Sequence, residues 1–439
     1  MSDCHRVSFG TGCRPPDAMI RPNRLAPLAL LLSSAFAHAG NGLNDFGFGP
    51  TSQSMGGADL ALSRDTAALN LNPAGLTQIR HRAFDVNVEP FGFIDVGHRD
   101  SLGNDTHADN PLGISMNGGL AWRISPELVA GFGFFGQGGA GFVYEDLRTG
   151  FGNRDEAESL FGSFKFAPGL AWQVSDRLSI GAALGIVWSS ARQKFFYDTS
   201  DPASGFGGFR LDSVKGWSAG GKYGFQYRPA PGWVIGAAYT DEIPIDLHGG
   251  EFRQNFEADP AIGSRVRYRE ASAKGLNIAS ETGVGVAWQA TPRLLLATEI
   301  NWIDWSHAMK KSTISASRPT TPGAPPTLRL EQNLDWRDQW VTSIGAEWRL
   351  DPKSRLRGGF NYGRNPVPKE TLSPLLNLIG TTSFSVGYAR DLSAHWTLNS
   401  CLLIQLDKEV SYDNPQSPFG PSREEWYAWI LQVGLSRRW

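Results

Sequence analysis

Long stretches of the chain alternate apolar residues with polar or small ones, and this period of two constrains the fold more than any other feature. From Leu178 to Ser189 the even positions are Leu, Ile, Ala, Leu, Ile and Trp, and the odd ones are Ser, Gly, Ala, Gly, Val and Ser. The same pattern recurs at 340–350 and 394–407. Successive side chains of a strand point to opposite faces, so each segment predicts a strand with one apolar face. No segment approaches the roughly 18 continuous apolar residues of a membrane helix.

Alternation alone fits both a soluble β-sandwich and a membrane barrel. The lengths of the connections between strands distinguish the two folds. We predict fourteen strands, near 83–97, 111–124, 127–141, 162–175, 177–195, 210–229, 232–248, 274–290, 292–308, 335–350, 353–365, 381–391, 394–410 and 424–439. Six tight turns, such as Ser125-Pro126 and Asp351-Pro352, alternate with seven long polar connections. Tight turns at one rim and long loops at the other are typical of outer-membrane barrels, with the turns in the periplasm.

Aromatic residues support a membrane-spanning barrel. Many lie near predicted strand ends, as interfacial girdles do, among them Trp122, Trp172, Trp188, Trp233, Tyr239, Trp288, Trp302, Trp305, Trp396 and Trp429. The terminal Trp439 shares a strand face with Leu431, Val433 and Leu435, although Arg437 falls on the same face. The predicted fold class is therefore all-β, a transmembrane antiparallel β-barrel of about 14 strands.

The N-terminus predicts an exported chain. Arg21 and Arg24 precede an apolar run of about 13 residues and the cleavage pattern Ala37-His38-Ala39, so residues 1–39 read as a signal peptide and residues 1–18 as an over-called start. Cleavage removes Cys4 and Cys13, which leaves Cys401 without an intrachain disulfide partner. The chain has 41 basic and 43 acidic residues, a balance that excludes electrostatic binding of nucleic acid.

Residues 40–80 do not alternate and form a separate predicted domain ahead of the barrel at 81–439. The segment is rich in glycine, including Gly56 and Gly57, and reads as compact turns and short helices. Asn72 can cap a helix through its side-chain oxygen, while Pro73 takes the first helical position, where a missing N–H has no cost. Ala74 completes the Asn-Pro-Ala tripeptide.

A glycine-rich segment ending in Asn-Pro-Ala before a fourteen-strand barrel resembles the FadL family of outer-membrane transporters for long-chain fatty acids and other hydrophobic compounds. The likeness continues through Phe135–Gly141, Pro168–Trp172, Asp304–Ser306, Trp336–Asp338 and Leu356–Phe360. It implies a hatch in the lumen that contains Gly56, Gly57, Asn72, Pro73 and Ala74. It also implies passive uptake, with sideways release through a gap in the wall. One departure is the apolar loop Ser373–Ile379, where many members carry an acidic, polar stretch.

Two groups of residues are candidates for working parts. Gly136, Gly138, Gly139 and Gly141 are lateral gate candidates, because clustered glycine kinks or bulges a strand. The alternative is that glycine only relieves crowding, just as Asn72 to Ala74 could be an ordinary capped turn. Glu299, Glu347 and Arg349 are lumen charges that could contact the hatch or a polar headgroup, or that simply pair with one another in a polar interior.

Apparent catalytic motifs do not fit their context. Gly216–Gly220 matches a hydrolase elbow around Ser218, but an alternating strand follows where a helix is required. Gly131–Gly136 matches a dinucleotide fingerprint without a βαβ unit. The histidines of the mature chain are scattered, so we expect no metal site, no cofactor and no catalytic residue.

The expected protein is a multi-pass transporter in the outer membrane of a Gram-negative bacterium, and not an enzyme. It takes up long-chain fatty acids or other hydrophobic compounds by passive diffusion through the hatch-gated barrel. A general diffusion porin and an outer-membrane barrel enzyme acting on lipids remain alternatives, and adhesion through the loops 249–273 and 309–333 is a third. Expected partners are a hydrophobic ligand, outer-membrane lipid and, through Trp439, the barrel assembly machinery. Barrel closure removes the need for another subunit, so we expect a monomer.

Overall fold

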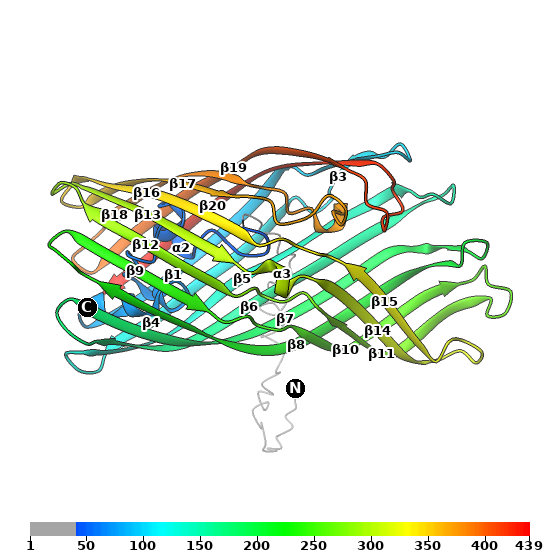
Figure 1. Cartoon of the computed structure of the whole chain (residues 1–439), viewed down its shortest axis with the longest axis horizontal. Helices are drawn as coiled ribbons and strands as arrows, with labels where there is room; N and C mark the ends of the chain where they lie inside the picture. The colour runs from blue at the N-terminus through cyan, green and yellow to red at the C-terminus, as the bar shows by residue number, and fades with distance from the viewer. Residues whose placement is uncertain (1–40) are drawn as a thin grey trace, which may run out of the picture. The chain divides into compact units, whose positions relative to one another are not determined.

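A closed antiparallel barrel makes up most of the computed structural model, which describes residues 41–439. The predicted signal peptide, 1–39, lies outside the described residues. The wall is one sheet whose last strand, β20 (Ser422–Arg438), pairs with its first, β1 (Arg82–Asp95), from Ala83 opposite Arg438 to Asp95 opposite Tyr427. Figure 1 shows the tilted strands of this wall. The predicted fold class, a barrel of 14 strands, is confirmed.

Each barrel strand pairs with the next one along the wall. The remaining barrel strands are β4 (Leu112–Arg123), β5 (Leu128–Arg148), β6 (Arg154–Gln173), β7 (Leu178–Asp201), β8 (Phe206–Tyr227), β9 (Trp233–Thr240), β12 (Glu281–Gln289), β13 (Leu294–Ile303), β16 (Gln339–Asp351), β17 (Ser354–Gly363), β18 (Thr382–Asp391) and β19 (Trp396–Tyr412). The six predicted tight turns all fall between these strands at one end, which we call the periplasmic end.

An apolar band surrounds the wall, as the alternation predicts. On β7, Leu184 is 50% exposed and Ile180 is 41% exposed, whereas Ser179 and Val187 are fully buried. Every barrel strand carries at least one exposed large apolar side chain. A continuous apolar band of this kind faces lipid and not water. The predicted girdle residues Trp122, Trp172, Trp233 and Trp288 are exposed close to the periplasmic end.

Trp305 is a wrong assignment, because it does not belong to the girdle. It lies fully buried in α3 (Trp305–Ala308), with its ring 5.1 Å from that of Trp336, and its Nε1 donates to Gln339 Oε1 at 3.3 Å. The helical turn after β13 interrupts the strand, so the alternation no longer sets which way the next side chain points. Arg437, the charged departure on the lipid-facing side of β20, lies over the rings of Trp396 and Trp439 at 5.2 and 4.2 Å.

The long polar connections were predicted too long, since most of them are strand. Residues 249–273 hold most of β10 (Asp246–Phe256) and β11 (Ser264–Lys274), and residues 309–333 hold β14 (Lys311–Pro319) and β15 (Thr327–Asn333). Together with β2 (Gly97–Asp100) and β3 (Asp105–His107), these strands continue barrel strands past short breaks at the outer end. Beyond the lipid the exposed strand face carries charged residues, as on β11 and β15, so the apolar outer face that marks the spanning strands is absent there.

The N-terminal segment, residues 41–80, lies inside the barrel. It contains α2 (Gly49–Gln53) and the short 3-10 helices η1 (Thr66–Leu69) and η2 (Pro73–Gln78). Its partners come from opposite sides of the wall, including Asp85 on β1, Ser179 on β7 and Glu299 on β13. Figure 1 shows this blue segment enclosed by the strands. No helix among residues 41–439 is long and apolar enough to cross a membrane.

Replacing Leu184 by Arg tests the position of the lipid-facing band. We expect Leu184→Arg to lower the free energy of unfolding by about 2 to 4 kcal/mol, because its side chain meets the middle of the bilayer. The control Leu350→Arg, at the periplasmic end of β16, should lower it by only about 0 to 1 kcal/mol. Guanidinium unfolding in phospholipid vesicles measures both values. Equal losses would contradict the assigned depth of the band.

Candidate functional site

Asn72 joins the N-terminal segment to the wall. Its Oδ1 accepts the Ala74 N–H at 3.2 Å, which is the predicted cap, while Pro73 begins η2. Its Nδ2 donates to the backbone oxygens of Leu60 at 2.7 Å and Phe225 on β8 at 2.9 Å. Asn72 is fully buried, so these bonds satisfy an amide that has no access to water. The tripeptide thus forms a capped turn that is also bonded to β8.

Gly56 and Gly57 allow the segment to pass close to its surroundings. Both have positive φ angles, +66° and +80°. A Cβ on Gly56 would lie 2.5 Å from the Phe360 oxygen on β17, and one on Gly57 would lie 2.2 Å from the Phe46 oxygen. Any other residue at these two positions would combine backbone strain with a steric clash.

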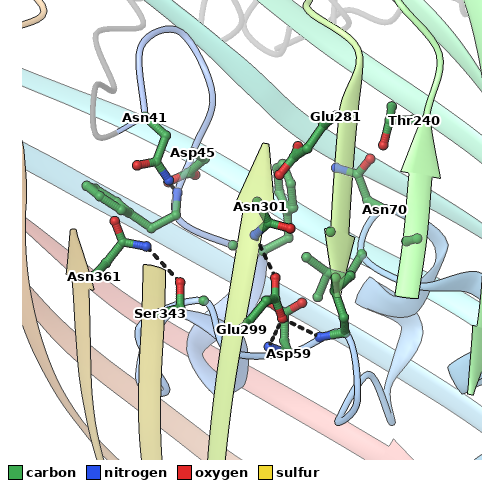
Figure 2. A pocket seen from close by; sticks show the side chains of 18 of the residues that line it. Asn41, Asp45, Asp59, Asn70, Thr240, Glu281, Glu299, Asn301, Ser343 and Asn361 are labelled. Atoms are coloured by element: carbon green, nitrogen blue, oxygen red, sulfur yellow. Dashed lines mark hydrogen bonds between the residues drawn. The ribbon is translucent and has the colours of Figure 1, made fainter. Parts of the chain in front are cut away.

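Glu299 holds the segment from β13. Its Oε2 accepts the N–H groups of Asp59 and Leu60, both at 2.8 Å, and its Oε1 accepts Asn301 Nδ2 at 2.8 Å (Figure 2). These groups line a polar cavity of about 60 Å³ between the segment and the wall, together with Lys222 and Glu281. One carboxylate therefore satisfies two buried backbone donors of the segment, which have no partner within it.

Of the other two predicted lumen charges, only Glu347 contacts the segment. Its Oε2 accepts Arg64 of the segment at 2.6 Å and Arg357 of β17 at 2.7 Å. Glu347 therefore both pairs with a charged residue of the wall and contacts the N-terminal segment. Arg349 lies exposed near the periplasmic end of β16, and the structure does not bring it to the segment.

The wall ladder is interrupted between β4 and β5. Pairing of these strands ends at Asn117 opposite Phe135, although β4 continues to pair with β1 as far as Leu112. On its other side β5 pairs with β6, with a bulge between Gly136 and Gly138. Bonding across the interruption resumes at Gly141, whose oxygen accepts Asn110 Nδ2 at 3.2 Å. Residues 112–116 and 137–140 thus flank a wall gap.

The predicted gate glycines all lie on β5 beside this gap. Gly138 and Gly141 have φ angles of +134° and +147°, which other residues rarely adopt. A Cβ on Gly138 would lie 2.3 Å from the Leu43 oxygen, so the N-terminal segment meets the inner side of the gap there. Gly136 donates its N–H to Asn117 Oδ1 at 3.1 Å, and Gly139 pairs with Gly162 on β6.

A larger, mostly apolar cavity of about 260 Å³ lies in the outer half of the barrel. Its apolar lining comes from the segment, the wall and the outer loops, and includes Leu43, Ala140, Phe161, Phe195, Phe209, Leu276, Ile314, Leu330, Leu334, Leu375, Leu376 and Phe419. Among the described residues that line it, Glu331 is the one charged side chain, and it is bonded to Lys311 and Arg329. The apolar loop noted in the sequence places Leu375 and Leu376 on this cavity. Leu43 lies both on the cavity and at the gap.

A buried polar cluster beside this cavity was not predicted. His98 on β2 lies between Glu424 Oε1, at 2.7 Å, and Asp100 Oδ2, at 3.1 Å. Glu424 also accepts Tyr412 Oη at 2.8 Å and Asn377 Nδ2, of the loop 364–381, at 3.3 Å. His98 and Glu424 are 326 residues apart, so no spacing in the sequence joins them. The cluster fastens the loop that carries Leu375 to β20.

The charge on His98 depends on its two carboxylates. Burial disfavours the charged ring, but the hydrogen bonds and charges of Asp100 and Glu424 outweigh burial and raise the pKa of His98 from 6.5 to about 9. Burial in turn raises the pKa of Glu424. The cluster lies beyond the lipid-facing part of β20, close to the ion pair of the exposed Glu409 with the half-buried Arg423.

The two sequence matches to catalytic or cofactor motifs both lie within strands. Ser218 is in the middle of β8, opposite Val187 of β7, and not at a turn before a helix. Gly131 to Gly136 are part of β5 and pair with residues of β6.

The comparisons with known proteins agree on one family. A profile of the family described as outer membrane protein transport protein (OMPP1/FadL/TodX) matches residues 29–398. No curated protein matches the sequence at a significant level.

Solved structures share the fold at low identity. The Ralstonia pickettii toluene transporter TbuX superposes with a TM-score of 0.71 at 21% identity, covering 90% of this chain and 99% of its own. The Pseudomonas putida toluene transporter TodX gives 0.73 at 17%, covering 90% and 99%. A Pseudomonas aeruginosa FadL homologue gives 0.68 at 15%, covering 92% and 100%.

Removing the Glu299 carboxylate should loosen the N-terminal segment. We expect Glu299→Ala to leave the Asp59 and Leu60 N–H groups without an acceptor, at about 1 to 3 kcal/mol for each buried donor. Hydrogen exchange at these amides should accelerate by about tenfold or more. Glu281→Ala, which removes a carboxylate of β12 from the same cavity, is the control. If exchange is unchanged in Glu299→Ala, the carboxylate does not hold the segment.

The His98 cluster predicts a pH-dependent loop. Because the pKa of His98 is raised from 6.5 to about 9, its contribution to stability is complete below pH 6.5 and disappears as the pH rises through about 9. We expect proteinase K to cleave the loop 364–381 faster over that interval. In the His98→Gln variant, the rate at which the loop is cleaved should change with pH only as the activity of the protease itself does. A wild-type profile that matches this variant would contradict the assignment.

Proposed function

The chain belongs to the outer membrane protein transport protein family (OMPP1/FadL/TodX), and from that premise we propose that it carries neutral hydrophobic compounds across the outer face of the outer membrane. The family membership and the barrel support a transporter of hydrophobic compounds in the outer membrane. The nature of the cargo and the route are the parts proposed here.

The lining of the apolar cavity is the observation that carries the choice of cargo. An engineered apolar cavity of about 150 Å³ binds benzene, so a volume of about 260 Å³ accommodates a substituted aromatic ring. A fatty acid would place its carboxylate among residues that include Glu331 but no Lys, Arg or His of the described lining. A buried carboxylate without a partner is strongly unfavourable. The cavity therefore favours a neutral hydrocarbon over a long-chain fatty acid, and both belong to the cargo classes expected from the family resemblance.

The proposed route leads sideways from the cavity to lipid. Leu43 lines the cavity, and its backbone oxygen also lies against Gly138 at the wall gap, so the cavity and the gap adjoin at this residue. A short displacement of Leu43 would join them. The ligand would then pass between residues 112–116 and 137–140 into the bilayer, and among these residues Ser115 and Gln137 are the two with polar side chains. Release in this direction requires no energy source, because a hydrophobic solute partitions into lipid spontaneously.

In this proposal residues 41–80 act as the hatch, with Gly56, Gly57 and Asn72 to Ala74 as its fixed parts. The polar bonds of Asn72, Glu299 and Glu347 hold the part of the N-terminal segment around residues 59–72 against the wall. They close the direct route to the periplasm, whereas the region of Leu43 is left as the moving part.

The alternatives receive less support. A diffusion porin needs an open aqueous lumen, and here the segment occupies it. A lipid enzyme needs a nucleophile at the outer rim, whereas Ser218 is in the middle of a strand. A monomeric state and recognition of Trp439 by the assembly machinery stay predictions from the sequence.

Uptake by whole cells tests the cargo. We expect cells that make the protein to take up labelled toluene faster than cells without it, with no difference for a long-chain fatty acid or a small hydrophilic solute. Leu375→Asp puts a charge into the cavity and should reduce toluene uptake by about tenfold or more, because the new carboxylate must be desolvated.

Leu392→Asp is the matched control, since Leu392 is 58% exposed at a periplasmic turn. Its toluene uptake should equal that of the wild type. Uptake of the fatty acid, but not of toluene, that depends on the protein would contradict the neutral cargo.

A further inference from the structure

One edge of the outer wall has no neighbouring strand. Among the described residues, the ladder partners of β15 all lie on β14, from Lys311 opposite Asn333 to Ser317 opposite Thr327. On its other side β17 would be the next strand, but β17 ends at Gly363 and the chain continues as the loop 364–381. The wall is therefore open along β15 at the outer end.

The open edge leads directly into the apolar cavity. Leu330, Glu331 and Gln332 of β15 line the cavity on one side, and Gln416 to Phe419 line it on the other. Glu331, Gln416 and Pro418 are exposed, whereas Phe419 and Leu334 are buried, at 1% and 2% exposure. Residues thus change from exposed and polar to buried and apolar between the edge and the cavity. We call the space between 330–333 and 416–419 the entry slot.

Few bonds cross the entry slot. The Asn333 N–H donates to Gln416 Oε1 at 3.1 Å. On the side of the slot opposite β15, Asn414 Nδ2 donates to the Leu372 oxygen at 2.9 Å, so the loops 413–421 and 364–381 are joined to each other. The base of the slot is closed where Thr371 Oγ1 donates to the Leu334 oxygen at 2.6 Å. Above that base, the Asn333–Gln416 bond holds β15 and the loop 413–421 together.

From this arrangement we infer that neutral hydrophobic ligands enter the cavity through the entry slot between β15 and the loop 413–421, with Gln416 as its latch. Gln416 is exposed, so water can replace its bond to Asn333 and the slot opens readily. Opening breaks no strand pairing, because β15 keeps β14. Trp340, 60% exposed just below on β16, places the slot beyond the outer lipid interface. The inference rests on the proposed function.

Cross-linking tests the slot in whole cells. Asn333→Cys and Gln416→Cys, joined by a short cleavable thiol cross-linker, should bring toluene uptake down to that of cells without the protein, and reductant should restore it. The native Cys401 is 1% exposed and out of reach of the reagent. The control pair Ser317→Cys and Thr327→Cys ties β15 to its ladder partner β14, and cross-linking should leave uptake unchanged.

The outcomes separate the slot from the function. Full uptake through the cross-linked slot pair would overturn the entry route and leave the proposed function intact. Wild-type uptake of toluene that does not depend on the protein would overturn both. Gln416→Ala offers a second measurement on a minimally changed chain. It should raise the initial uptake rate above that of the wild type, and an unchanged rate would contradict the latch.

Discussion

The need to satisfy every backbone polar group in lipid determines the rest of this structure. Water is absent from the bilayer core, so each strand must pair on both sides and the sheet must close, as β1 and β20 do. The interruption between β4 and β5 keeps to this rule through substitutes. Asn117 and Asn110 bond to Gly136 and to Gly141 with their side chains, and the N-terminal segment covers the inner side. An opening to lipid can exist only where such substitutes are available.

Closure with so many strands creates the second requirement. Side chains fill a barrel of about eight strands, but a wider one leaves a lumen that must be occupied or conduct water. Residues 41–80 occupy it, and their contacts divide the interior. Polar bonds from Asn72, Glu299 and Glu347 fix the lower part, while an apolar cavity remains above, with Leu43 at its boundary. On the proposed route, a solute from outside meets the mostly apolar cavity first, with these polar contacts below it.

The alternation of residues predicted the spanning strands and the tight turns, because alternate side chains of a spanning strand face lipid and the lumen and therefore differ in polarity. It failed where that contrast ends. The outer strands β11 and β15 carry charged residues on their exposed face instead of apolar ones, and Trp305 lies in a break that reorients the chain. Clustered glycines predicted the position of the bulge in β5, but not that Leu43 meets it. The groups that donate to Glu299 are backbone amides, and His98 meets Glu424 across 326 residues, so neither contact has a local sequence signal.

Photoaffinity labelling tests the central claim, sideways passage from the cavity to lipid, most directly. A photoreactive toluene analogue would be activated on the protein in outer-membrane vesicles, and the labelled residues would be identified by mass spectrometry. The account predicts label at Leu43, on the apolar cavity and on both sides of the gap, at 112–116 and 137–140. Label along the polar lumen at Lys222, Glu281 and Glu299, with none at the gap, would contradict it.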